Sequence, residues 1–210
     1  MSSAPIARLF QLYFRKDISN FTFTQTYDFN TLGPNRIPIQ AENGDFEYER
    51  PINGTEAVNQ GVELIARQNL YFLPGALDGL SIALSATFTE SDADYPDRTD
   101  RDLPLEGFSE KLYTATIDYN WENFSARVDY RFRDDYIEGL GDNIESDEFF
   151  AAEERIDAEM HYRIMENLRL TATVVNLTDR GQISYQGFPP FVEDASFAGR
   201  KFNFGVQYDF

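Results

Sequence analysis

The sequence has 210 residues, enough for one domain, and 18 Lys and Arg against 36 Asp and Glu give a formal net charge of −18. So acidic a chain lacks the basic surface that nucleic-acid binding needs. Aromatic residues make up 15% of it, too many for an acidic disordered chain. The absence of cysteine excludes disulfides, thiol nucleophiles and Cys-ligated metals.

Two further absences concern export and membrane insertion. No run approaches the roughly 18 apolar residues of a transmembrane helix. The first residues also lack the basic and apolar pattern of a secretory signal, so either the protein is not exported or a preceding segment carries the signal.

Alternation of apolar and polar residues runs through the chain and predicts strands with two unlike faces. In the first strand, Phe10, Leu12 and Phe14 are expected on the apolar face. In all, we expect about nine strands, and several are about ten residues long, the length that a tilted strand needs to cross a membrane. The alternating segments are 10–14, 21–23, 62–66, 80–88, 113–121, 124–132, 156–164, 168–174 and 202–210.

The links between these segments alternate in length. Short links are expected near 17–20, 121–123 and 165–167, with a somewhat longer one at 73–79. Long polar links are expected near 28–56, 90–107, 134–154 and 179–200. Short turns on one side and long loops on the other are typical of outer-membrane barrels. The long links also hold about two thirds of the acids but only a third of the bases.

Aromatic residues gather beside the short links, as in the interfacial girdle of a membrane barrel. The sequence therefore predicts an all-β fold, an antiparallel transmembrane β-barrel segment. The alternative is a soluble β-sandwich or a lipocalin-like binding protein, for which shorter strands and loops would be usual. The girdle residues are Tyr71, Phe72, Tyr119, Trp121, Phe124, Tyr162, Tyr208 and Phe210.

One strand carries charges on its polar face: Arg127, Asp129, Arg131 and Arg133. If this face lines a lumen, the arginines could bind an anionic ligand, because guanidinium pairs with carboxylates in a bidentate manner. Ion pairs with Asp129 or neighbouring acids are the simpler interpretation.

No catalytic, cofactor-binding or metal site is predicted, and we do not expect an enzyme. His161, the single histidine, has no motif that would supply a nucleophile, so it is interpreted as a lumen-lining residue. The acidic run 92–102 could offer oxygens to Ca²⁺ but lacks the glycine and final glutamate of an EF-hand loop. A solvated acidic loop is the simpler interpretation, and the same holds for the acids Asp142, Glu145, Asp147 and Glu148.

The ending, 199–210, resembles the last strand of TonB-dependent receptors. Other segments resemble this family in the order in which the family has them. They are Pro51–Gly54, Asn59–Leu64, Leu73–Leu80, Ser125–Arg133 and Asn176–Arg180. The terminal alternation also resembles the signal that the barrel assembly machinery reads; its residues are Phe202, Phe204, Val206, Tyr208 and Phe210.

The resemblance implies a barrel of about 22 strands with a plug in its lumen. Residues 1–210 would then be the C-terminal portion of the barrel, without the plug, and the first of nine strands would run towards the periplasm. The arginine face could contact the plug as well as a ligand.

The implied function is uptake of an iron chelate, cobalamin or a saccharide across the bacterial outer membrane. The implied partners are outer-membrane lipid, the barrel assembly machinery, a small-molecule ligand and a TonB-type coupling protein that an earlier segment would engage. The acidic links disfavour a strongly anionic ligand.

Overall fold

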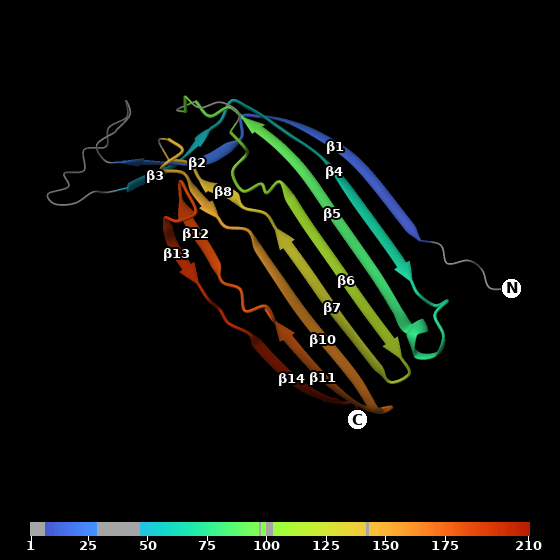
Figure 1. The fold of residues 1–210 in the computed structure, drawn as a ribbon. Coiled ribbons are helices and arrows are strands. Elements are labelled where there is room, and N and C mark those ends of the chain that lie inside the picture. Colours follow the sequence, from blue (N-terminus) through green and yellow to red (C-terminus); the bar gives the residue numbers. More distant parts are fainter. Residues whose placement is uncertain (1–6, 29–46, 97, 100–102, 142) are drawn as a thin grey trace.

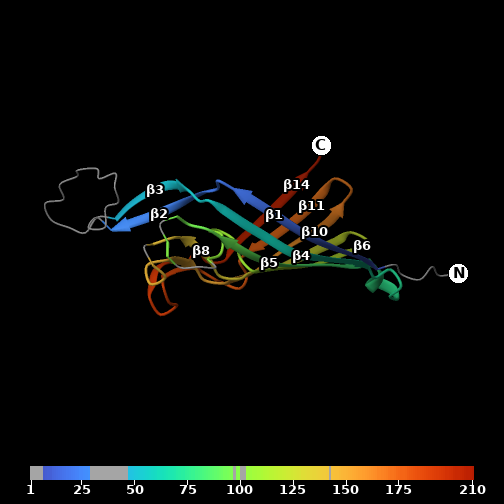
Figure 2. The ribbon, with the colours of Figure 1, turned by 90° about the horizontal axis from the view of Figure 1, so that it is seen from above.

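The computed structural model describes residues 7–28, 47–96, 98–99, 103–141 and 143–210. About half of these residues form one curved antiparallel sheet of eight strands, called the wall below (Figures 1 and 2). In spatial order the strands are β1 (Arg8–Ser19), β4 (Glu56–Asn69), β5 (Leu80–Ala93), β6 (Lys111–Trp121), β7 (Phe124–Arg133), β10 (Glu153–Met165), β11 (Leu168–Val175) and β14 (Lys201–Tyr208). β1 and β14 are the edges, so the wall is open.

The strand register gives the wall two unlike faces, because directly paired residues of neighbouring strands point to the same side. One paired row crosses six strands and is apolar throughout: Ile82, Ile117, Val128, Ala158, Val174 and Phe202. The adjacent row on the other face is polar in β6, β7 and β10, with Thr116, Asp129 and Asp157. The predicted alternation is thus confirmed over most of the chain.

The apolar face is uncovered. Ile117 is 47% exposed, Val128 41% and Phe204 81%. A soluble sandwich would pack a second sheet over such a face, whereas the two smaller sheets lie beyond one end of the wall (Figure 1). At the opposite end, Trp121, Phe124 and Tyr162 form a directly paired aromatic row. These features fit a wall that faces lipid and do not favour a sandwich or lipocalin-like fold.

The beginning of the wall differs from the prediction. The short link near 17–20 is not a turn between two wall strands. After β1, the chain passes Asn20 into β2 (Thr22–Asp28), which pairs with β3 (Glu47–Asn53) in a separate hairpin. β1 pairs directly with β4. The wall therefore has eight strands where about nine were predicted, and β1 runs away from the short turns rather than towards them.

The orientation of β1 side chains also differs from the prediction. Phe10 is paired with Ile65 and Phe14 with Gly61, which places both aromatic residues, and Leu12 between them, on the polar face. A Cβ on Gly61 would lie 2.9 Å from the Phe14 ring and would overlap the Phe88 carbonyl oxygen. Glycine at this position therefore lets the Phe14 ring lie against the backbone of β4.

The two ends of the wall differ in their links. At the short-turn end, tight turns join β6 to β7 and β10 to β11, and a link with the 3-10 helix η2 (Gly75–Gly79) joins β4 to β5. At the long-link end, the links are themselves folded. Two of them supply the second sheet, in the order β13 (Val192–Ser196), β12 (Gln182–Gln186), β9 (Glu148–Phe150) and β8 (Tyr136–Gly139).

The hydrophobic core of the described residues lies at the long-link end, not within the wall. It gathers buried side chains from the β2–β3 hairpin, the ends of β4 and β5, and the links after β5 and β7. They are Phe23, Ala57, Ala93, Tyr95, Leu103, Leu105, Ile137 and Leu140. Among the described residues, no helix is long and apolar enough to cross a membrane.

Candidate ligand-facing surface and its loop support

The four charged residues predicted on one strand face do share the polar face of the wall, along β7. Arg127 donates from Nε to Asp129 Oδ2 at 2.9 Å, and its Nη1 lies 3.6 Å from Asp118 Oδ1. The Thr116 hydroxyl donates to Asp129 Oδ1 at 2.6 Å. Arg127 and Asp129 therefore neutralise one another within the wall.

Arg131 is the most open of the three arginines. Its side chain is 63% exposed, and its Nη2 lies 3.9 Å from Asp157 Oδ2, at the limit of an ion pair. The other oxygen of Asp157 accepts hydrogen bonds from Arg155 Nε and from the Asn176 amide, both at 2.8 Å. Because Asp157 is already satisfied by these donors, Arg131 retains most of its hydrogen-bonding capacity.

Arg133 joins the wall to the links instead of facing open space. Its Nε donates to Ser109 Oγ and its Nη2 to the Gly107 carbonyl, both at 2.7 Å. The guanidinium also lies 3.6 Å from the centre of the Tyr136 ring. Of the predicted set, Arg131 is therefore the residue best placed to contact a ligand.

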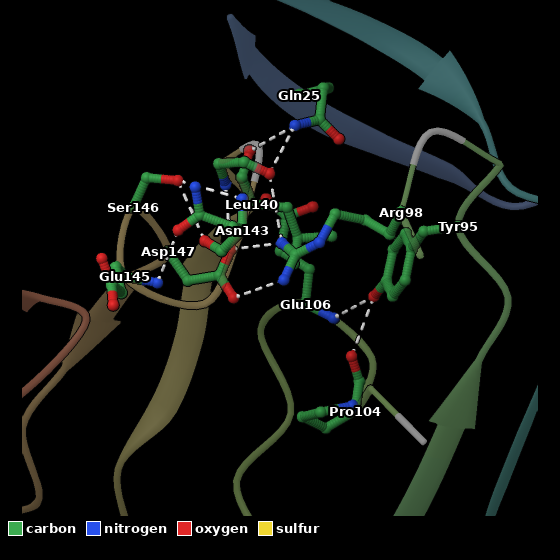
Figure 3. Close-up of polar contacts among 11 residues, drawn as sticks. Gln25, Tyr95, Arg98, Pro104, Glu106, Leu140, Asn143, Glu145, Ser146 and Asp147 are labelled. Carbon is green, nitrogen blue, oxygen red and sulfur yellow. Dashed lines mark hydrogen bonds and ion pairs between the residues drawn. The ribbon is translucent and has the colours of Figure 1, made fainter. Parts of the chain in front are cut away.

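A buried ion pair holds the long links together (Figure 3). Arg98 donates from Nη2 to Asp147 Oδ2 at 3.0 Å and from Nη1 to Oδ1, and the two side chains are 1% and 0% exposed. The Gly141 amide donates to Asp147 Oδ1 at 3.0 Å. Gln25, from the β2–β3 hairpin, donates to the carbonyls of Leu140 and Gly141 at 3.0 and 2.7 Å. Three separate chain segments thus meet at one polar centre.

Tyr95 forms the second anchor of this assembly. Its hydroxyl donates to the Pro104 carbonyl at 2.9 Å and accepts from the Glu106 amide at 3.1 Å. Its ring packs on Phe23 at 4.6 Å between centroids. Burial raises the pKa of Tyr95 to about 12, so the hydroxyl stays protonated and continues to donate.

The carboxyl group of Glu106 lies in the same assembly, where the Thr24 amide donates to its Oε2 at 3.2 Å. Burial, reinforced by the nearby Glu138, raises the pKa of Glu106. These links therefore contain a carboxylate whose charge is disfavoured by its surroundings.

The acids considered for Ca²⁺ do not form a cation site where the structure describes them. Asp147 is paired with Arg98, and Asp142 and parts of 92–102 lie outside the described residues. Within the described part of the chain, no group of three or more His, Cys, Asp or Glu residues could hold a metal ion. The Arg98–Asp147 pair was missed by sequence reasoning, since its only signal was an arginine within an acidic run.

The segment 176–180 has a structural role that explains its pattern. Asn176 adopts a left-handed backbone conformation (φ 60°), and its side-chain amide donates to the Arg180 carbonyl at 2.9 Å and to the Gly199 carbonyl at 3.2 Å. Its Oδ1 accepts from the Arg180 amide at 3.1 Å. Asn176 thus fixes both ends of the long link between β11 and β14.

The remaining predicted residues lie on β14 and β10. The terminal set Phe202, Phe204, Val206 and Tyr208 forms the apolar face of the β14 edge, and the Phe210 ring follows 5.0 Å from that of Tyr208. His161 lies on the polar face of β10, with Nε2 3.7 Å from Glu159 Oε1. Within the described part of the chain, no hydrogen bond joins His161 to a hydroxyl group.

An open antiparallel wall with one apolar and one polar face, an aromatic row, and short turns opposite long links defines part of a transmembrane β-barrel. Residues 13–177 match the family model described as TonB dependent receptor-like, beta-barrel. The chain therefore belongs to the TonB-dependent receptor family, whose members are receptors and transporters of the bacterial outer membrane. A search of curated proteins finds no matching relative.

Solved structures of transport proteins have a similar fold. The Copper transporter OprC is 18% identical, with a TM-score of 0.62 over 97% of this chain and 29% of its own. The Ferric-Catecholate import receptor Fiu from K12 E. coli is 16% identical, with a TM-score of 0.58 over 97% of this chain and 25% of its own. The FrpB iron transporter from Neisseria meningitidis (F3-3 variant) is 14% identical, with a TM-score of 0.56 over 99% of this chain and 29% of its own. The chain thus spans between a quarter and a third of these proteins.

Proposed function

We propose that this chain forms the C-terminal portion of the barrel of an outer-membrane receptor that takes up a scarce nutrient, with energy supplied through TonB. The observation that carries the proposal is the two-faced wall with a packed loop assembly at one end, in a chain of the TonB-dependent receptor family. Outer-membrane lipid would cover the apolar face, and the polar face would line the lumen. The plug and the segment that engages TonB would lie in the rest of the polypeptide.

The proposed ligand classes are an iron chelate, cobalamin or a saccharide. An iron chelate is the first to test, because two of the similar structures are named as a ferric-catecholate import receptor and an iron transporter. Links rich in acids would repel a strongly anionic ligand. Arg131, near the long-link end of the polar face, would offer hydrogen-bond donors to the oxygens of an iron chelate.

The test is uptake by cells that make the complete protein and lack their other receptors for the same nutrients. Accumulation of labelled ferric chelate, cobalamin or oligosaccharide should stop when a protonophore collapses the proton gradient. Binding at the cell surface should persist under the same treatment. Uptake that continues without the gradient would show passive diffusion and reject the TonB-coupled function.

A matched pair of variants tests the role of Arg131. Arg131→Gln should weaken ligand binding by about tenfold, the effect of losing one charge-assisted hydrogen bond of about 1.4 kcal/mol. Arg131→Lys keeps the charge but not the planar fork, so partial retention would indicate charge recognition alone. Arg127→Gln, where the side chain is occupied by Asp129 and Asp118, should change binding little. Equal losses in Arg131→Gln and Arg127→Gln would argue against direct contact.

A further inference from the structure

A polar cavity of about 370 Å³ lies at the short-turn end of the wall, far from the loop assembly. It is bounded by the turn between β6 and β7 and by the facing ends of β10 and β11. Its basic lining residues are His161, Arg163 and Arg169. Neither the proposed ligand contact at Arg131 nor the loop network involves these residues.

The strand register sets two positive charges against each other in this cavity. Arg163 and Arg169 are direct partners across β10 and β11. Like charges directly opposite one another destabilise an antiparallel pair, whereas opposite charges stabilise it. An anion lying near both side chains would offset this repulsion.

The described residues do not supply that negative charge. Arg163 donates from Nε and Nη2 to the neutral Asn123 Oδ1, at 3.3 and 3.2 Å. Neither Arg163 nor Arg169 forms an ion pair within the described part of the chain. Glu122 also lines the cavity, from a left-handed turn position (φ 49°), but it is not within ion-pair distance of either arginine.

An unsatisfied buried atom marks the same place. His161 Nδ1 is buried and has no hydrogen-bond partner, while Nε2 of the ring lies 3.7 Å from Glu159 Oε1. A buried polar atom without a partner is unfavourable and calls for an explanation, such as a water or an ion close to it. Two arginines without ion-pair partners and a histidine with one unpartnered ring nitrogen thus line a single cavity.

We infer that this cavity binds an oxyanion, a carboxylate or a phosphate, held mainly between Arg163 and Arg169. Two planar guanidinium groups are suited to sharing such a group through bidentate hydrogen bonds. The oxyanion could be an acidic side chain of the polypeptide that precedes this chain, or a free small anion. Because the cavity lies at the opposite end of the wall from Arg131, the inference does not depend on the proposed nutrient.

The experiment measures the thermal midpoint Tm of the complete protein in detergent, in inorganic phosphate and in chloride at equal ionic strength. Arg163→Gln and Arg169→Gln are compared with Arg127→Gln, an arginine of the same face that has its own carboxylate partners. If an oxyanion is bound, Arg169→Gln should lower Tm below that of both the wild type and Arg127→Gln.

The phosphate arm separates the two sources of the oxyanion. A higher wild-type Tm in phosphate, lost in Arg163→Gln and Arg169→Gln, would establish a free anion. No effect of phosphate together with a lower Tm in both variants would indicate a carboxylate of the protein.

Two results would overturn the inference. An unchanged or higher Tm for Arg169→Gln would mean that only repulsion was removed. An equal loss in Glu122→Gln would identify the chain's own Glu122 as the partner.

Discussion

Replacing Asp147 with asparagine tests whether the long links form one packed unit. The substitution keeps the size of the side chain but removes the charge that faces Arg98. The new amide could still accept one hydrogen bond, yet the buried guanidinium, at 1% side-chain exposure, would lose the carboxylate that it contacts through both Nη atoms. The Gly141 amide, which donates to Asp147 Oδ1 at 3.0 Å, would also lose a charged acceptor.

The expected magnitude follows from this burial. Removing one partner of a buried ion pair costs about 3–5 kcal/mol, because the other charge stays desolvated. Each 1.4 kcal/mol is a factor of ten, so local opening of the links should become roughly 10²–10⁴ times more frequent. The wall should be unaffected, since its strands are held by their own ladders of hydrogen bonds.

Amide hydrogen exchange of the complete protein, read by mass spectrometry, measures this opening. Peptides from 103–109 and 134–141 should exchange faster in Asp147→Asn, while peptides from β10 and β11 should not change. Asp134→Asn removes an ion pair with the exposed Lys111 (2.9 Å) and should change the exchange of these peptides little. The double variant Arg98→Met with Asp147→Leu should recover much of the protection. Equal exchange in Asp147→Asn and wild type would refute the view that this pair holds the links together.

Three further predictions concern other parts of the chain. The raised pKa of Glu106 means that the folded state binds more protons than the unfolded state above the ordinary value of 4.5. The stability of the links should therefore fall as the pH rises from 4.5 through the raised pKa of Glu106. Amide hydrogen exchange, measured at a series of pH values, should show this fall in the wild type and not in Glu106→Gln. A Cβ on Gly79 would overlap the Asn120 carbonyl oxygen, so Gly79→Ala should lower Tm by several degrees, whereas Gly75→Ala, with open space around it, tests backbone strain alone. Deleting Phe210 should reduce the heat-modifiable, folded fraction in outer membranes if the terminal aromatic residue guides assembly; an unchanged fraction would reject that role.

The wall from β5 onward could be predicted from the sequence because local pattern and environment agree there. Each of these strands has one face in an apolar medium and one in a polar medium, so a period of two is imposed on every residue. The chain segments 113–121 and 124–132 show this in full, and the register pairs their apolar residues row by row. The short turns could be predicted as well, because only a few residues separate consecutive alternating segments.

The first strand could not be read in this way, because it has apolar residues on both faces. Leu9 and Tyr13 share a face with Ala66 and Val62, while Phe10 and Phe14 occupy the opposite face. A period of two cannot choose between two apolar sets. The choice is made by the partner strand, where Gly61 leaves room for Phe14 on one side only. Long-range packing of this kind is not a property of the local sequence.

The same distinction explains what could be predicted of the sites. The arginines of β7 were recognised because strand alternation alone places them on one face. The Arg98–Asp147 pair joins residues 49 positions apart in two links with no periodicity, so nothing local relates them. Arg163 and Arg169 are only six residues apart, but their opposition depends on the register of a tight turn, and their significance depends on the absence of nearby acids among the described residues.

The wall and the folded long links therefore bury their apolar side chains in different ways. The wall exposes large apolar side chains, which a lipid environment would favour, whereas the folded links lie beyond one end of the wall and exclude water by their own packing. This requirement explains why the buried core and the buried ion pair of the described residues lie at the long-link end. Loops that only connected strands would need neither feature. A packed assembly with interlocking polar contacts instead gives the long-link end of the wall a defined structure, next to the polar face on which Arg131 is exposed.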